Sequence, residues 1–136
     1  MHLNVKSELL QEKSKTNSQE AIRMHELGIV IQIVKQMEHY MDDNDIKRID
    51  TLVLGVGELS GVVPKYLRDV YPIAVEKSRL CNTKLELEIT PGIGQCKHCG
   101  FNYNLVQNDN NCPKCGTNDF KIITGKDFLI QRIHAE

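Results

Sequence analysis

Two pairs of cysteines with the spacing Cys-x-x-Cys constrain this chain more than any other feature of its sequence. Cys96 and Cys99 form the first pair, Cys112 and Cys115 form the second, and the twelve residues 100–111 lie between them. The segment that holds the pairs is dominated by Asn, Asp, Gly and Lys and has almost no apolar core. Such a segment cannot fold by burying apolar side chains alone, so something else must hold it.

A structural Zn²⁺ ion fits this pattern. Four thiolates at about 2.3 Å close a tetrahedral site, and Gly100 and Gly116 permit the turn that follows each pair. The metal then supplies the folding free energy that the missing core cannot. We therefore predict a structural zinc domain over residues 93–123, with His98 as an exposed neighbour of the metal. The predicted ligands are Cys96, Cys99, Cys112 and Cys115. A rubredoxin-like iron site and a redox dithiol are the alternatives that the same thiolates leave open.

The rest of the chain alternates helical and strand patterns. Apolar residues recur every three or four positions from Leu27 to Met41, which predicts a helix that begins at His25 and ends near Asp42. A second helix is expected from Pro64, because proline suits the first turn of a helix. Strands are predicted at 49–56, 85–89 and 128–134 from their β-branched or alternating composition.

Together these elements predict an α+β fold: a small mixed β-sheet with two helices, into which a zinc-ribbon-like domain with four cysteine ligands is inserted. The last strand is expected to pair with the strand that ends near Thr90. The main α/β domain then comprises residues 24–92 together with 124–136, on either side of the zinc domain. Residues 1–23 are polar and have few apolar side chains, so we expect a flexible or loosely helical leader.

Composition excludes several classes of protein. The 17 basic and 18 acidic residues are mixed and give a net charge of −1, so no overall field draws the chain to nucleic acid or to an anionic membrane. No run approaches the roughly 18 apolar residues that a membrane span requires. We expect a cytoplasmic protein, in whose reducing surroundings paired cysteines bind metal rather than form disulfides.

Two other classes of function come into question. An enzyme is not expected, because the sequence has no nucleophile set, phosphate-binding glycine loop or open three-ligand zinc site. A zinc ribbon that binds nucleic acid or protein is the stronger alternative, since aromatic and basic side chains of the zinc domain could stack on bases and pair with phosphates. These side chains are Phe101, Tyr103, Lys97, Lys114 and Lys121. The acidic Asp109 and Asp119 reduce the positive charge of this patch.

Three motifs in this order resemble the hydrogenase and urease nickel metallochaperone family HypA/HybF. They are Met-His-Glu-Leu-Gly at 24–28, Val-Gly-Glu-Leu-Ser-Gly-Val-Val-Pro at 56–64, and the two cysteine pairs. The resemblance covers residues 24–136 and implies a nickel carrier with a structural Zn²⁺. It implies Ni²⁺ ligands at Met24, through an N-terminal amine, and at His25, through its amide and imidazole, with Glu26 as a nearby carboxylate.

The resemblance also implies partners. These are a hydrogenase-maturation GTPase and, as recipient, a [NiFe]-hydrogenase large subunit or urease accessory proteins, and it allows a homodimer. It assigns no catalytic residue and no organic cofactor, so the expected metals are structural Zn²⁺ and transported Ni²⁺.

The leader departs from this family pattern. With residues 1–23 present, Met24 has a peptide nitrogen in place of an amine, and one strong nickel donor is lost. Three explanations stay open: translation starts at Met24, the leader is an artefact, or the chain-terminal Met1 and His2 provide the donors. We expect the start at Met24.

Overall fold

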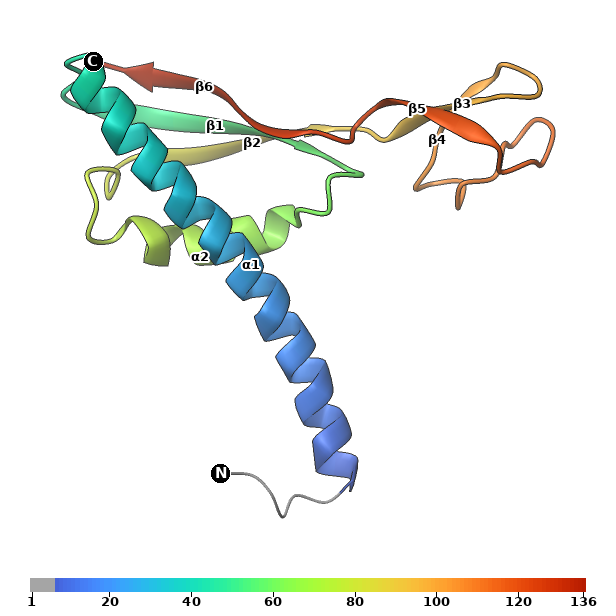
Figure 1. Ribbon diagram of the computed structural model, residues 1–136, viewed down its shortest axis with the longest axis horizontal. Helices are drawn as coiled ribbons and strands as arrows, with labels where there is room; N and C mark the ends of the chain where they lie inside the picture. The colour runs from blue at the N-terminus through green and yellow to red at the C-terminus, as the bar shows by residue number, and fades with distance from the viewer. Residues whose placement is uncertain (1–6) are drawn as a thin grey trace.

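The computed structural model describes residues 7–136 and contains two helices and two small sheets (Figure 1). The helices are α1 (Ser7–Asp43) and α2 (Pro64–Val75). The strands are β1 (Ile49–Gly57), β2 (Lys84–Thr90), β3 (Ile93–Cys96), β4 (Asn102–Asn104), β5 (Phe120–Thr124) and β6 (Phe128–Ala135). The predicted α+β fold class is confirmed, and no helix among residues 7–136 is long and apolar enough to cross a membrane.

The first sheet has the strand order β2-β1-β6, with β2 parallel and β6 antiparallel to the central β1. The expectation that the last strand pairs with the strand ending near Thr90 is wrong, because β6 lies on the other side of β1. The reason is burial: Leu52, Val53 and Leu54 of β1 are 0% exposed. A strand in such surroundings needs partners on both sides, since no water is available for its backbone groups.

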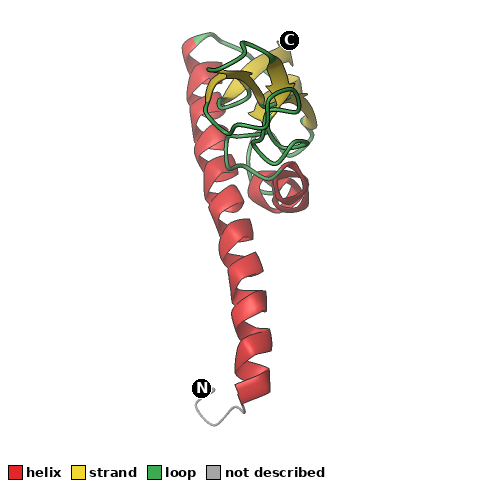
Figure 2. Ribbon diagram, turned by 90° about the vertical axis from the view of Figure 1, so that its right-hand side faces the viewer, coloured by secondary structure: helices red, strands yellow, loops and turns green. Residues whose placement is uncertain are grey.

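Both helices cover one face of this sheet and bury its core (Figure 1). Helix α2 follows the predicted pattern, with Leu67, Val70 and Val75 buried. Helix α1 ends at Asp43 as predicted but begins at Ser7 rather than at His25. Its first half has no apolar stripe, yet Glu, Gln, Lys and Ala favour a helix by intrinsic propensity. Figures 1 and 2 show this half projecting away from both sheets. The flexibility expected of residues 1–23 stays a prediction.

The second sheet, with the order β4-β3-β5, carries the cysteine pairs and lies beside the first (Figure 1). The chain enters it directly after β2 and leaves it just before β6, so it is an insertion between two strands of the first sheet. Its core is small: Tyr103 and Leu105 are buried with Cys96 and Cys112. The domain boundaries expected from the sequence remain a proposal that this topology supports.

The loop between β1 and α2, residues 58–63, joins the two parts of the molecule. Leu59 packs on the small core of the second sheet, and its N–H donates to the Gly125 carbonyl at 2.7 Å. The Glu58 carboxylate accepts hydrogen bonds from the Gly92 N–H at 2.7 Å and from the Asn104 side-chain amide at 3.1 Å. This loop therefore contacts the cysteine-bearing sheet at its core and at Asn104, and also contacts both connections between the sheets, at Gly92 and Gly125.

Candidate metal centres

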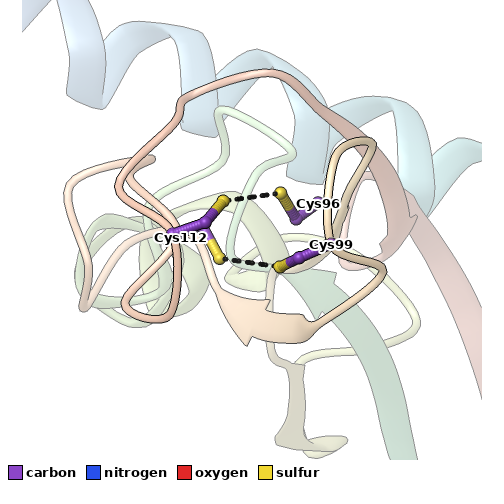
Figure 3. Close-up of side chains that lie close together, drawn as sticks. Cys96, Cys99 and Cys112 are labelled. Atoms are coloured by element: carbon purple, nitrogen blue, oxygen red, sulfur yellow. Dashed lines mark hydrogen bonds between the residues drawn. The ribbon is translucent and has the colours of Figure 1, made fainter.

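The four cysteine sulfurs form one cluster at the end of the second sheet. Their Sγ atoms all lie within 4.8 Å of one another, with Cys96 3.4 Å from Cys115 and Cys99 3.6 Å from Cys112. Figure 3 shows Cys96, Cys99 and Cys112 with their sulfurs turned toward a common centre. Cys96 ends β3, whereas the other three lie in the loops, so residues distant in sequence meet at one point.

Each cysteine pair is held by a tight turn of the same design. The Gly100 N–H donates to the Cys96 carbonyl at 2.9 Å, and the Gly116 N–H donates to the Cys112 carbonyl at 2.8 Å. Both glycines adopt a left-handed backbone, with φ of 78° and 81°. Side chains with a Cβ atom rarely adopt this region, which explains why glycine follows each pair, as the sequence predicted.

The surroundings of the sulfurs lower the pKa values of Cys96 and Cys112 and raise the pKa of Cys99. The Thr117 hydroxyl, followed by the Cys99 and His98 N–H groups, lowers the pKa of Cys96 to about 5. The Phe101 N–H acts to lower the pKa of Cys99, but burial and the neighbouring sulfurs together outweigh it and raise that pKa to about 11. A divalent cation among the sulfurs would displace the protons that remain on them.

The cluster has the dimensions of a tetrahedral thiolate site. A metal with bonds of about 2.3 Å to sulfur places four tetrahedral sulfurs about 3.8 Å apart. The two sulfur pairs, at 3.4 and 3.6 Å, are close to that spacing, and no pair exceeds 4.8 Å. The cysteines thus fit Zn²⁺ with small adjustments, and they would fill all four of its positions.

Several aromatic and basic side chains of the cysteine-bearing segment contact other groups of that segment. Tyr103 is 5% exposed, and its hydroxyl donates to the Asn110 carbonyl at 3.0 Å. Lys97 faces the carboxylate of Asp119 at 3.7 Å, and Lys114 lies over the ring of Phe101. These contacts engage four of the five side chains that would stack on bases or pair with phosphates, and the nucleic-acid alternative is not favoured.

The Met-His-Glu motif lies inside α1, near the start of α2. The Met24 and His25 side chains are each 63% exposed, whereas Glu26 is 0% exposed. Glu26 Oε1 lies 3.1 Å from His25 Nδ1, and Oε2 accepts a hydrogen bond from the Val63 N–H at 2.7 Å. The imidazole is thus held on its Nδ1 side, and among the residues that the structure describes Nε2 has no hydrogen-bond partner.

The motif differs from the cysteine cluster in its supply of ligands. Among the described residues, the four cysteines are the one group of three or more Cys, His, Asp or Glu side chains that could hold a metal ion. His25 and Glu26 have no third such side chain beside them in that part of the chain, so a metal at His25 would need backbone nitrogen, water or a partner to complete its shell.

Two residues of these sites were not singled out as important from the sequence. Thr117 contributes a hydroxyl to the sulfur cluster, at 3.4 Å from Cys96 and 3.3 Å from Cys115. Val63 contributes the N–H that receives Glu26, and as the first residue ahead of α2 it has no side-chain cap of its own. The sequence could have indicated Thr117, because it lies two residues after a cysteine, where donors to sulfur are found. Nothing in the sequence indicates the contact that Val63 makes with Glu26.

The fold and the cluster define a small metal-binding protein, in which an α/β domain carries an exposed Met-His-Glu segment and an inserted sheet carries four cysteines. The family model described as "Hydrogenase/urease nickel incorporation, metallochaperone, hypA" matches residues 24–135. The chain therefore belongs to the HypA family.

Similar proteins agree with this assignment. A hydrogenase maturation factor HypA of Crocosphaera subtropica is 32% identical over 113 residues, which are 83% of this chain and 96% of that relative. The corresponding factor of Chlorobium luteolum is 31% identical over 110 residues, covering 81% and 94%. The solution structure of the Ni metallochaperone HypA from Helicobacter pylori has the same fold, with a TM-score of 0.55 and 20% identity over 81% of this chain and 96% of that one.

Proposed function

We propose that this chain carries Ni²⁺ at the Met-His-Glu segment and delivers it during the assembly of a nickel enzyme, a [NiFe]-hydrogenase or a urease. The observation that carries this proposal is the placement of His25, which is exposed on α1 and oriented by the buried Glu26. The family match also begins at Met24, the first residue of this segment. An exposed imidazole with open positions around it suits a carrier, because the metal must enter and leave.

Within this proposal, Met24 and His25 supply nickel ligands and Glu26 acts on the imidazole. Both oxygens of Glu26 already have partners, at His25 and at the Val63 N–H. Direct coordination through Oε1 would compete with the His25 contact, and coordination through Oε2 would weaken the Val63 contact at the start of α2. Glu26 therefore contributes by holding the ring, and it becomes a ligand only if this region rearranges.

The helical backbone limits which donors are available. Met24 and His25 lie in the interior of α1, where amide nitrogens bond to the carbonyls four residues earlier. A backbone nitrogen binds Ni²⁺ only after it loses its proton, so the helix must open at Met24 or begin there. In the full chain we expect the imidazole to be the main donor, with water or a partner completing the shell.

The four cysteines are proposed to hold a structural Zn²⁺. Zn²⁺ favours tetrahedral thiolate sites, whereas Ni²⁺ in proteins favours tetragonal nitrogen and oxygen ligands. Four protein ligands also leave no position for a catalytic water, which supports a carrier over an enzyme. The site needs reduced thiols, as the cytoplasm provides. Iron bound in the same way, or an oxidised dithiol, would be revealed by metal analysis.

The loop of residues 58–63 is proposed to connect the two metal centres. At one end Glu58 and Leu59 hold the cysteine-bearing sheet, and at the other end Val63 bonds to Glu26 beside His25. Binding or loss of a metal at the cysteines would shift this loop, and the contact between Val63 and Glu26 would pass the shift to His25. The proposed partners are a maturation GTPase and a hydrogenase large subunit or urease accessory proteins, with a homodimer as a further assembly.

Nickel titration of paired histidine variants tests the carrier function. His25→Ala should remove most Ni²⁺ binding, measured by calorimetry on zinc-loaded protein, while zinc content and far-UV circular dichroism stay unchanged. His39→Ala is the matched control, because His39 is on the same helix, is 80% exposed and faces Asp43 at 3.4 Å. Unaltered nickel affinity in His25→Ala, or equal losses in both variants, would contradict the proposal.

A further inference from the structure

The sulfur cluster has a hydroxyl group beside it, and this group lies on one edge. Thr117 Oγ1 is 3.4 Å from Cys96 Sγ and 3.3 Å from Cys115 Sγ, so it spans the pair of sulfurs that are themselves 3.4 Å apart. These distances suit hydrogen bonds to sulfur, which is larger than oxygen and accepts at longer range. With a metal bound, the sulfurs carry no protons, and the Thr117 hydroxyl is then the donor.

The equivalent position of the first cysteine pair has no such group. Each pair is followed by a glycine and one further residue, which is Phe101 in the first pair and Thr117 in the second. Phe101 is 41% exposed and reaches Cys99 through its backbone N–H. The cluster is therefore asymmetric: the Cys96 and Cys115 edge has a side-chain donor, and the Cys99 and Cys112 edge relies on backbone.

The local fold holds Thr117 in this place. Its carbonyl accepts a hydrogen bond from the Cys112 N–H at 2.8 Å, and Gly116, before it, closes the turn onto the Cys112 carbonyl at 2.8 Å. Thr117 is only half-buried, so burial alone does not explain its orientation. The turn that presents Cys115 to the metal thus presents the Thr117 hydroxyl to two sulfurs as well.

We propose that Thr117 is a positioning residue of the metal centre, whose hydroxyl shares its one proton between the Cys96 and Cys115 thiolates and so retains the metal and shields Cys115 from attack. Four thiolates around a divalent cation leave two excess negative charges, and a donor to charged sulfur stabilises them more than a donor to a neutral group. Partners outside the ligand shell typically change metal affinity by about 10- to 100-fold. The inference rests on the proposed Zn²⁺ site.

Three variants isolate the hydroxyl. Thr117→Val keeps the shape of the side chain and removes the donor, and Thr117→Ser keeps the donor and removes a methyl group. Thr124→Val is the matched control, because it deletes a hydroxyl of the same sheet that bonds to the Pro91 carbonyl at 2.8 Å instead of to sulfur. If valine disturbs the turn, as judged by circular dichroism and zinc content, Thr117→Ala replaces it.

Two measurements on the full, zinc-loaded chain test the proposal. In competition with a chromogenic chelator, Thr117→Val should release Zn²⁺ about tenfold faster than wild type, with the serine variant and the Thr124→Val control close to wild type. On brief treatment with iodoacetamide, peptide mapping should show that Thr117→Val raises alkylation of Cys115 relative to Cys99, which is also exposed. Altered folding alone would raise both.

The outcomes separate this inference from the assignment on which it rests. A wild-type chain that holds no Zn²⁺ would overturn the zinc site and the role of Thr117 together. One Zn²⁺ per chain, with release rates and Cys115 to Cys99 ratios equal in wild type and Thr117→Val, would overturn the role of Thr117 alone. Equal behaviour of the serine and valine variants would also overturn it, because the hydroxyl would then be irrelevant.

Discussion

The buried carboxylate of Glu26 offers the sharpest test of how the Met-His-Glu segment is built. This side chain is 0% exposed and links α1 to the residue ahead of α2, where the Val63 N–H donates to it at 2.7 Å. Val63 has no side-chain cap, so Glu26 performs from a neighbouring helix the task that a capping residue usually performs locally. Glu26→Ala removes this contact and the contact to His25.

The expected cost follows from these contacts. Leaving the part-buried Val63 N–H without its acceptor costs about 2 kcal/mol, and losing one buried methylene group of Glu26 removes about 0.8 kcal/mol of hydrophobic stabilisation. Glu26→Ala should therefore lower the free energy of unfolding by about 3 kcal/mol and Tm by roughly 10 °C for a chain of this size. Glu26→Gln keeps an oxygen for Val63, so its cost should stay below about 1 kcal/mol.

Thermal unfolding of zinc-loaded protein, followed by far-UV circular dichroism, measures these costs. Glu20→Ala is the control, because Glu20 is an exposed glutamate on the same helix and should change stability by less than about 0.5 kcal/mol. If Glu26→Ala unfolded within about 2 °C of wild type, the link between the helices would carry no stability and the reasoning would be refuted. Nickel titration of Glu26→Gln should show weaker binding, because the single amide oxygen stays with Val63 and the NH2 group cannot accept a proton from His25 Nδ1, as the orienting role of the carboxylate requires.

Three further predictions concern the leader, the cysteines and the joining loop. A chain beginning at Met24 should bind Ni²⁺ about five- to tenfold more tightly than the full chain in calorimetric titration, because no helical hydrogen bond must be broken to free the backbone nitrogen; equal affinities would contradict this. Cys112→Ala should abolish zinc binding and unfold the second sheet in NMR spectra while α1 and α2 persist, whereas Cys81→Ala, which changes an exposed cysteine outside the cluster, should leave both intact. The Gly92 N–H holds the pKa of Glu58 below its ordinary value of 4.5, so this contact stabilises the fold fully above about 4.5 and is lost as the pH falls through the lower folded-state pKa. The Gly92 amide shift should follow that loss in wild type and stay flat in Glu58→Gln.

Short-range patterns in the sequence predict much of this structure. The Cys-x-x-Cys pairs, each followed by glycine, specified the sulfur cluster because ligand spacing and the left-handed turn are local properties of the chain. Helix α2, the end of α1 and strands β1 and β2 followed from apolar periodicity, which depends only on neighbouring residues. The motifs at 24–28 and 56–64 also indicate the family from the sequence alone.

Tertiary structure decided the partners of these elements and the roles of single side chains. The sequence of β6 does not indicate whether it pairs with β1 or with β2. It pairs with β1 because the buried backbone of β1 must be hydrogen-bonded on both sides. The start of α1 was missed because propensity alone extends a helix that has no apolar stripe to mark it. Glu26 was a first-turn acid or a metal ligand by sequence, and it became a link between helices because folding brings the Val63 N–H to it from 37 positions away. Hydrogen bonds between distant residues exist only after the chain has folded, so local patterns do not encode them one by one.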